Sequence, residues 1–179
     1  MRTCAYIATS LDGFIARPDG GLDWLPQPVE GGEDYGYGHF FASIDALVIG
    51  RNTFDTVLSF GQWPYADKRL WVLSSRELAL PAFVPPTVTR WSDSLAALVD
   101  ELTAHGVRKV YVDGGKTIQS FLQANLLDEI TITTIPVLIG QGISLFGPRD
   151  VDVNLELLEN RAFKDGLVQN RYAVIKDKP

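Results

Sequence analysis

Apolar runs and amphipathic stretches alternate along most of this chain. Buried strands are predicted where aliphatic and β-branched side chains follow one another, at residues 2–9, 46–49, 69–73, 88–91 and 109–112. Short helices are predicted between them, at residues 34–43, from about residue 53, from about residue 93 to 105, and at residues 116–124. Strands that alternate with helices indicate an α/β fold whose mostly parallel sheet is covered on both faces.

The third of these helices has the clearest pattern. Ser92 or Asp93 is expected to cap its start, and Gly106 is expected to end it. Its apolar residues fall on one stripe between these positions: Leu95, Leu98, Val99 and Leu102. Such a stripe predicts a helix that packs one face against the sheet.

The last third of the chain follows a different pattern. Isoleucine and threonine alternate at the start of residues 130–139, which predicts a long strand. From residue 154 onward two further strands are expected around the turn Lys164-Asp165-Gly166, a hairpin signal. We find no internal repeat or linker, so residues 1–179 are expected to form one domain that ends in an antiparallel hairpin.

A long stretch after the first strand, residues 10–33, is rich in glycine, proline and aspartate, and is expected to be a loop. Loops of this length in a compact domain tend to be lids or walls of binding sites. Ala8, Ile15, Trp24 and Leu25 would be suitable apolar walls for a flat ligand. Packing in the core is the other explanation for each of these four residues.

Composition and charge narrow the class of protein. With 179 residues, 46% hydrophobic and 21% charged, the chain is typical of one folded domain. The net charge of −6 argues against a nucleic-acid partner, which would need a basic surface. Cys4 is the single cysteine and there are two histidines, so we expect no disulfide and no metal site.

The apolar runs also bear on location. The first strand begins without a basic segment followed by an apolar one, so we expect no signal peptide. No apolar run approaches the roughly 20 residues that span a bilayer, so we expect no membrane partner. The cytoplasm is therefore the expected compartment.

Chemically distinctive residues follow three of the predicted strands. In open α/β sheets, ligands bind beyond the carboxyl ends of the strands, where the chain turns into the next helix. Each of the three turns offers amide donors and a cation, the combination that binds phosphate. The turns are Gly50-Arg51-Asn52-Thr53, Ser74-Ser75-Arg76 after Leu73, and Gly114-Gly115-Lys116-Thr117 after Asp113.

The residues of these turns also have ordinary explanations. Gly114 and Gly115 would let the backbone approach a pyrophosphate, but a glycine pair is more often plain turn chemistry. Arg51, Arg76 and Lys116 could bind an extra phosphate, such as the 2′-phosphate of NADP, although surface cations at helix starts are usually solvated. The P-loop and GxGxxG patterns are both absent. The hypothesis of a dinucleotide site therefore depends on the three turns meeting.

Two carboxyl groups are candidates for assisting hydride transfer to a C=N bond, which requires a proton on nitrogen. An acid whose pKa is raised by an apolar pocket could hold the substrate and help this protonation. Asp34 precedes the aromatic residues 35–41, where its carboxyl would be partly desolvated, and Asp12 lies at the turn of the long loop. Asp34 is also a good helix cap and Asp12-Gly13 a good turn, so both explanations stay open.

Taken in order, these motifs resemble the dihydrofolate-reductase-like superfamily, and within it the reductase domain of bifunctional riboflavin-biosynthesis deaminase-reductases and its stand-alone relatives. The resemblance implies a three-layer α/β/α fold and NADPH as the cofactor. The motifs cover nearly the whole chain: Ser10-Leu11-Asp12-Gly13-Phe14-Ile15-Ala16, Leu22-Asp23-Trp24-Leu25, Ile49-Gly50-Arg51-Asn52-Thr53-Phe54, Leu73-Ser74-Ser75-Arg76, Asp113-Gly114-Gly115-Lys116-Thr117, and residues 127–130 with 136–146.

The resemblance implies roles for particular residues. Ala8 and Ile15 would surround the nicotinamide, and residues 50–53 and 73–76 would surround the adenosine phosphate. The pyrophosphate would lie along Gly114, Gly115, Lys116, Thr117 and Ile118. Asp34 stands at the position of the family's substrate-binding acid, with Thr133 hydrogen-bonded to it, and Trp24 and Leu25 are further candidates for substrate contact. Asp113 replaces the family's third glycine.

The resemblance implies a reductase that passes hydride from NADPH to a pyrimidine- or pteridine-like heterocycle. The first expectation is 5-amino-6-(5-phosphoribosylamino)uracil reduction in riboflavin biosynthesis, with Arg17 and Lys68 as candidate cations for the substrate phosphate. Dihydrofolate reduction is the alternative activity, and a non-catalytic NADP-binding module is the alternative of another class. The resemblance also suggests a homodimer, but no stretch of the sequence marks an interface.

Overall fold

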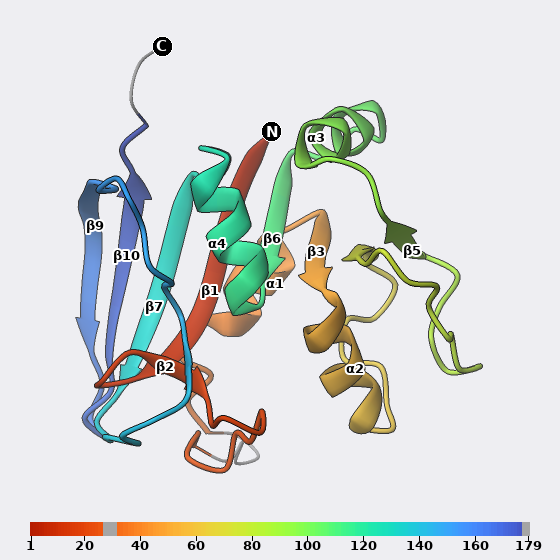
Figure 1. Ribbon diagram of the computed structural model, residues 1–179. Helices are drawn as coiled ribbons and strands as arrows, with labels where there is room; N and C mark the ends of the chain where they lie inside the picture. The colour runs from red at the N-terminus through yellow and green to blue at the C-terminus, as the bar shows by residue number, and fades with distance from the viewer. Residues whose placement is uncertain (27–31, 177–179) are drawn as a thin grey trace.

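A large sheet forms the centre of the molecule, for which the computed structural model describes residues 1–26 and 32–176. Its strands are β1 (Arg2–Ser10), β3 (Ala46–Gly50), β4 (Arg69–Leu73), β5 (Val88–Trp91), β6 (Lys109–Asp113), β7 (Glu129–Ile135), β9 (Leu155–Ala162) and β10 (Val168–Val174). They follow the order β5-β4-β3-β6-β1-β7-β10-β9 (Figure 1). The strands from β5 to β7 in this order run parallel, and the β9–β10 hairpin joins β7 antiparallel.

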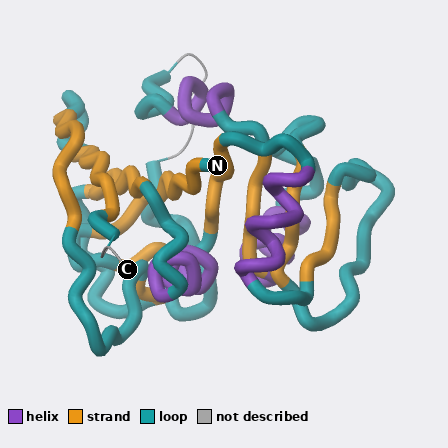
Figure 2. The backbone as a smooth tube through the Cα atoms, turned by 90° about the horizontal axis from the view of Figure 1, so that it is seen from above, coloured by secondary structure: helices purple, strands orange, loops and turns teal. Residues whose placement is uncertain are grey.

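Helices cover both faces of this sheet, as the view from above shows (Figure 2). One face carries α1 (Tyr37–Ser43) and α2 (Arg51–Ser59), and the other carries α3 (Leu95–Ala104) and α4 (Gly115–Gln123). Successive residues of β3 serve opposite faces, so Leu47 and Ile49 pack with α2 whereas Ala46 and Val48 pack with α3 and α4. The three-layer α/β/α prediction, with its mostly parallel sheet and C-terminal hairpin, is confirmed. Among the described residues, no helix is long and apolar enough to span a bilayer.

Several element boundaries differ from the prediction by a few residues, and two of these differences have a clear physical cause. The cap of α3 is Ser94, whose Oγ accepts a hydrogen bond from an amide of the first turn at 3.2 Å, and not Ser92 or Asp93. Strand β7 ends at Ile135, short of the predicted end, and the next residue is Pro136, which has no amide hydrogen to continue the ladder.

A second, smaller sheet lies in the stretch predicted to be a loop. Strand β2 (Phe14–Ala16) pairs antiparallel with β8 (Ile143–Ser144). The turn before β2 is tied to the same distant segment, because the Leu11 amide donates to the Val137 carbonyl at 2.8 Å. Residues 11–16 of the loop are therefore folded against residues 137–145. Residues 27–31 of the predicted loop lie outside the described residues.

Candidate functional site

The three turns singled out in the sequence lie side by side at the carboxyl ends of β4, β3 and β6. The strand register places Gly50 opposite Leu73 and Ile49 opposite Asp113, so the three chain reversals are neighbours. We call this surface the carboxyl rim and define it as residues 50–53, 73–76 and 113–118. The structure thus brings together the segments on which the hypothesis of a dinucleotide site depends.

Glycines let the turns of the carboxyl rim approach one another closely. A Cβ atom at Gly50 would lie 2.8 Å from Thr117 Oγ1, and one at Gly114 would collide with Thr53 Oγ1. Gly114 also has a φ of +93°, a conformation that L side chains rarely adopt. The close packing of the start of α2 against the start of α4 therefore requires glycine at both positions.

Two helices begin at the carboxyl rim with their amide donors uncapped. Gly50 is the N-cap of α2 and Gly114 the N-cap of α4, and among the described residues no side chain caps either helix. In contrast, the Ser94 side chain caps the start of α3. Uncapped first-turn amides, together with the positive end of the helix dipole, favour an anion at this place. The arrangement fits the pyrophosphate of a dinucleotide.

The cations of the carboxyl rim differ in how they are held. Arg51 Nε lies 2.8 Å from Asp55 Oδ1, and its Nη1 donates to a carbonyl of a neighbouring loop at 3.0 Å, which fixes the guanidinium. Asn52, Arg76 and Lys116 are exposed. These side chains put positive charge and polar groups around the two helix starts, which suits a phosphorylated ligand.

Ser74 and Ile118 contribute differently from the expectation. The Ser74 hydroxyl donates to the Arg76 carbonyl at 2.7 Å and accepts from the Arg76 amide at 3.1 Å, so the turn itself uses it. Ser75 beside it is exposed. Ile118 is fully buried in the core, and its amide donates to the Gly114 carbonyl at 2.9 Å. Ile118 therefore supports α4 from inside and does not line the surface.

Arg90 adds a cation that sequence reasoning missed. Its Nη2 lies 2.9 Å from Glu77 Oε1, and its Nη1 lies 3.5 Å from the Ser74 carbonyl. The parallel pairing of β5 with β4 brings it there, because Trp91 lies opposite Leu73. The position of Arg90 beside the rim follows from the register in which β5 pairs with β4, which the sequence does not show.

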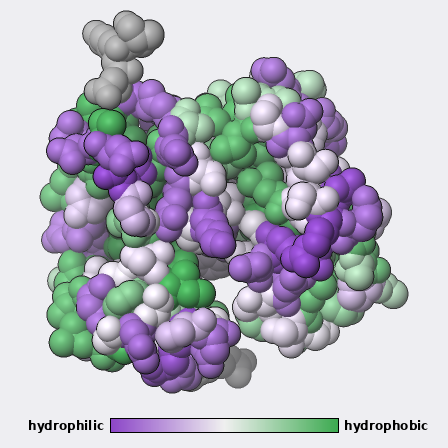
Figure 3. All heavy atoms as spheres, in the orientation of Figure 1, coloured by the Kyte–Doolittle hydropathy of each residue, from purple (hydrophilic) through white to green (hydrophobic). Residues whose placement is uncertain are grey.

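The loop after β1 meets the carboxyl rim at the start of α4. A Cβ atom at Gly115 would lie 2.7 Å from Ile15 Cδ1. Ala8 is half-buried, two residues after Tyr6, which stacks on Phe40 of α1. The space-filling view shows the surface hollowed between this loop and α2 (Figure 3). Ile15, which was expected to lie beside the nicotinamide, therefore gives the rim an apolar neighbour. The role of Ala8 stays a prediction.

Asp12 and Asp34 are both exposed, and the expectation of a raised pKa is wrong for both. The Asp12 carboxylate accepts hydrogen bonds from the amides of Gly140 at 2.8 Å and Ile139 at 3.3 Å, and a hydrogen bond with Ser10 is the main cause of its lowered pKa. Asp12 thus ties the loop after β1 to the segment after β7. Its catalytic role stays a prediction.

The Asp34 carboxylate accepts hydrogen bonds from the amides of Gly36 at 2.8 Å and Gly38 at 2.9 Å. These two hydrogen bonds lower its pKa, because they favour the charged form. The aromatic neighbours do not desolvate the carboxyl as expected, since it faces the backbone that leads into α1. Whether Asp34 also contacts substrate stays a prediction.

Thr133 is bonded to Gln169 and not to Asp34 as expected. Gln169 Nε2 lies 2.8 Å from Thr133 Oγ1, 2.8 Å from the Tyr6 hydroxyl and 3.0 Å from the Tyr35 carbonyl. Gln169 lies on β10 directly opposite Thr133. The hairpin therefore supplies the hydrogen-bond partner of Thr133, in place of Asp34, which the resemblance implied. This glutamine was missed because its three hydrogen-bond partners come from three separate segments.

Within the carboxyl rim, Asp113 is the acidic residue, and its side chain has a raised pKa. Burial raises the pKa of Asp113 from 3.8 to about 6, although its Oδ1 accepts the Gly114 amide at 2.8 Å. Burial raises the pKa of Tyr37, Tyr65 and Tyr111, and the negative charge of Asp113 raises it further. An acid of this kind was expected at the site, but sequence reasoning treated this position only as a replaced glycine.

The remaining candidates belong to the loop after β1 or hydrogen-bond to other groups of the protein. Trp24 and Leu25 are both half-buried. The indole N–H of Trp24 has no acceptor among the described residues. Arg17 makes two hydrogen bonds to the carboxylate of Asp23, at 2.6 and 2.8 Å. Lys68 donates to the Ile44 carbonyl, next to the amino end of β3, so its role in binding a substrate phosphate stays a prediction.

Among the described residues, no group of three or more histidine, cysteine, aspartate or glutamate side chains converges as a metal-ligand set.

Comparisons with known proteins identify relatives over nearly the whole chain. The family model described as RibD C-terminal domain matches residues 4–169. The "Putative riboflavin biosynthesis protein" of Shewanella sp. PV-4 is 38% identical, with a TM-score of 0.90 over 98% of this chain and 100% of that chain. The "Uncharacterized protein YwjB" of Bacillus subtilis strain 168 is 32% identical over 164 residues, 90% of this chain and 92% of that protein.

A more distant structure shows the same fold. It is a diaminohydroxyphosphoribosylaminopyrimidine deaminase/5-amino-6-(5-phosphoribosylamino)uracil reductase of Thermotoga maritima, 16% identical, with a TM-score of 0.72. The match covers 97% of this chain and 56% of that chain. At this identity the likeness concerns the fold alone.

Proposed function

This chain belongs to the RibD C-terminal domain family, and we propose that it is an NADPH-dependent reductase of a pyrimidine- or pteridine-like heterocycle. The substrate that the family favours is 5-amino-6-(5-phosphoribosylamino)uracil or a close relative of it. The observation that carries the proposal is the carboxyl rim. There, the uncapped first turns of α2 and α4 lie next to each other, with several cationic side chains around them.

NADPH would be held by backbone and side chains of the carboxyl rim. The first-turn amides after Gly50 and Gly114 would bind its pyrophosphate, and Arg76 and Lys116 would add charge for the remaining phosphate. Ile15 would form an apolar wall on the side of α4. When bound, NADPH supplies the hydride.

The chain itself would supply a proton through Asp113. Its pKa of about 6 keeps a usable fraction of the acid protonated near neutral pH, which suits a general acid. The carboxyl lies between the start of α4 and the cluster of Tyr37, Tyr65 and Tyr111. Asp12 and Asp34 are less suited to this role, because hydrogen bonds keep their pKa low.

Steady-state oxidation of NADPH tests the proposal. We expect turnover with 5-amino-6-(5-phosphoribosylamino)uracil and about 10²-fold lower kcat for Asp113→Asn, with unchanged NADPH affinity. The wild-type kcat should fall as pH rises above about 6, because the donor must be protonated, and Asp113→Asn should lose this dependence.

The matched control is Asp34→Asn, which keeps an oxygen that can accept from the amides leading into α1. Its kcat should change much less than that of Asp113→Asn. Equal losses in the two variants would contradict the assignment of the proton donor. Turnover with dihydrofolate alone would correct the substrate, and binding of NADPH without reduction of any heterocycle would leave a non-catalytic module.

A further inference from the structure

A second group of cations lies at the end of the sheet opposite the carboxyl rim, where β3, β4 and β6 begin (Figure 1). The segments that lead into these three strands line a hollow of about 540 Å³. We call it the amino-end hollow and define it as Asp45, residues 66–69 and residues 105–108. Pockets of this size accommodate small organic ligands. The proposed function gives this hollow no role.

Three cations with permanent charge line the amino-end hollow, namely Lys68, Arg69 and Arg108. Arg69 is the first residue of β4, and Arg108 directly precedes β6. Ala46, the first residue of β3, pairs with Arg69 on one side and with Val110 of β6 on the other. The two arginines therefore flank the start of β3 from opposite sides.

The guanidinium groups of Arg69 and Arg108 are not engaged by the protein. Both side chains are exposed, and neither forms an ion pair within the part of the chain that the structure describes. At least six of the ten arginines of the chain do pair with an acid. In a chain with a net charge of −6, two such arginines at one hollow are an exception that favours an anionic ligand.

Asp45 shows that this place already favours a negative charge. Its Oδ2 accepts the amides of Arg108 and Lys109, each at 2.9 Å. Partial burial raises the pKa of Asp45, but these hydrogen bonds and the charges of Arg108 and Lys68 outweigh it and lower the pKa. The carboxylate is thus used by the backbone at the starts of β3 and β6, and the guanidinium groups stay available.

The ends of two helices explain only part of the positive charge. The carbonyl ends of α1 and α3 lie just before β3 and β6, and such ends favour nearby cations. Lys68 serves α1, because its Nζ donates to the Ile44 carbonyl at 2.5 Å. The last carbonyls of α3 accept the amides of residues 105–107. Within the described residues, Arg69 and Arg108 donate to neither helix end.

We propose that the amino-end hollow binds a small phosphate monoester, with its phosphate held between Arg69 and Arg108. Guanidinium groups match phosphate oxygens in bidentate geometry, and a phosphate monoester carries up to two negative charges near neutral pH. Nothing lies within 4 Å of a Cβ atom added at Gly106, so the wall beside the cations leaves room for the organic part. This site does not depend on the proposed function.

Isothermal titration calorimetry with ribose 5-phosphate tests the proposal. We expect binding to the wild-type chain, and a dissociation constant raised at least about tenfold by Arg69→Gln or by Arg108→Gln, since each change removes one charged donor. Ribose, which lacks the phosphate, should give no heat. Arg149→Gln is the matched control, because Arg149 is exposed and lies outside the amino-end hollow. Its dissociation constant should equal that of wild type.

Arg76→Gln separates the amino-end hollow from the carboxyl rim, which also offers cations to a phosphate. Ribose 5-phosphate should still shift the amide NMR signals of residues 66–69 and 105–108 in this variant. Thermal unfolding should first show that each variant is folded, as expected for exposed side chains. Binding that Arg76→Gln abolishes and that Arg69→Gln and Arg108→Gln leave intact would overturn the proposal. Absence of binding at millimolar ribose 5-phosphate would also overturn it.

Discussion

Three aspartates near the carboxyl ends of the strands carry pKa shifts of opposite direction. Asp12 and Asp34 accept backbone amides in exposed positions, which lowers the pKa of each. Asp113 accepts one amide and is half-buried, and the effect of burial on its pKa outweighs that of the hydrogen bond. The same residue type is thus a structural anchor at two positions and a candidate acid at the third. The position of its side chain decides which.

Asp113 should make the stability of the fold depend on pH. The native state holds its proton with a pKa of about 6, whereas the unfolded chain has a pKa near 3.8. The stabilisation is therefore fully present below pH 3.8 and is lost as the pH rises through 6. Urea unfolding should show the free energy of unfolding of wild type falling by about 1–3 kcal/mol relative to Asp113→Asn between these limits.

Asp113→Asn is its own control in this comparison, because the amide cannot ionise at any of these pH values. The variant should be more stable than wild type at neutral pH and less active. A difference in stability between the two proteins that stays constant with pH would show that folding does not raise the pKa of Asp113.

At the scale of elements, the sequence pattern was enough to predict a strand or helix wherever the segment's own side chains determine its structure. The strands at residues 69–73 and 88–91 have the predicted bounds, because each is rich in residues that favour strands and is followed by serine. Strand β2 was missed because its three residues become a strand only by pairing with β8, more than a hundred residues away. The same reason explains Gln169, whose contacts depend on the pairing of β10 with β7.

The candidate site also has a part that the sequence could predict and a part that it could not. The turns after β3, β4 and β6 could be predicted, since the end of a parallel strand and its glycines are visible in the sequence. The pKa of Asp113 could not be predicted, because it depends on burial beside Tyr37 and Tyr65, which lie far away along the chain. Sequence patterns thus locate the carboxyl rim, but they do not show which of its neighbouring acids has a raised pKa.

Gly114→Ala should separate the role of the α4 start from that of an ordinary helix end. Gly114 has a φ of +93° and faces Thr53, so a methyl group should cost about 1–2 kcal/mol of stability. It should also weaken NADPH binding by at least about tenfold, because it disturbs the turn that precedes the first amides of α4. Urea unfolding and fluorescence titration measure the two effects.

Gly106→Ala is the matched control for this variant. Gly106 follows α3 with a φ of +71°, and nothing lies within 4 Å of an added Cβ atom. We expect a stability loss of about 1 kcal/mol with NADPH affinity unchanged. A similar affinity in both variants would mean that the start of α4 does not contact the cofactor.

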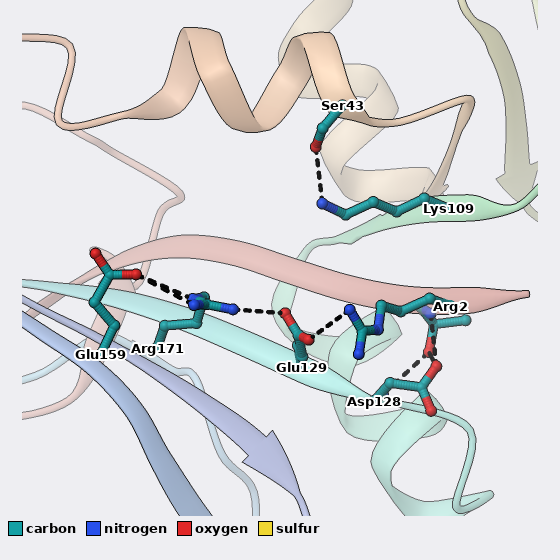
Figure 4. A network of polar contacts seen from close by, with 8 residues as sticks. Arg2, Ser43, Lys109, Asp128, Glu129, Glu159 and Arg171 are labelled. Carbon is teal, nitrogen blue, oxygen red and sulfur yellow. Dashed lines mark hydrogen bonds and ion pairs between the residues drawn. The ribbon is translucent and has the colours of Figure 1, made fainter.

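At the scale of the whole molecule, the proposed cofactor site and the C-terminal hairpin occupy different parts of one sheet. The carboxyl rim lies at the ends of the parallel strands, whereas the hairpin forms one edge of the sheet (Figure 1). Ion pairs join Arg2, Glu129, Arg171 and Glu159 across β1, β7, β10 and β9 (Figure 4). These contacts tie the hairpin to the strand that leads into the loop beside the rim.

The most direct test of this account is isothermal titration calorimetry of the wild-type chain with NADPH. We predict one binding site per chain with a micromolar or lower dissociation constant, and weaker binding of NADH, which lacks the phosphate that Arg76 and Lys116 would contact. Absence of heat with NADPH, or equal affinity for NADH, would contradict the assignment of the carboxyl rim to a phosphorylated dinucleotide.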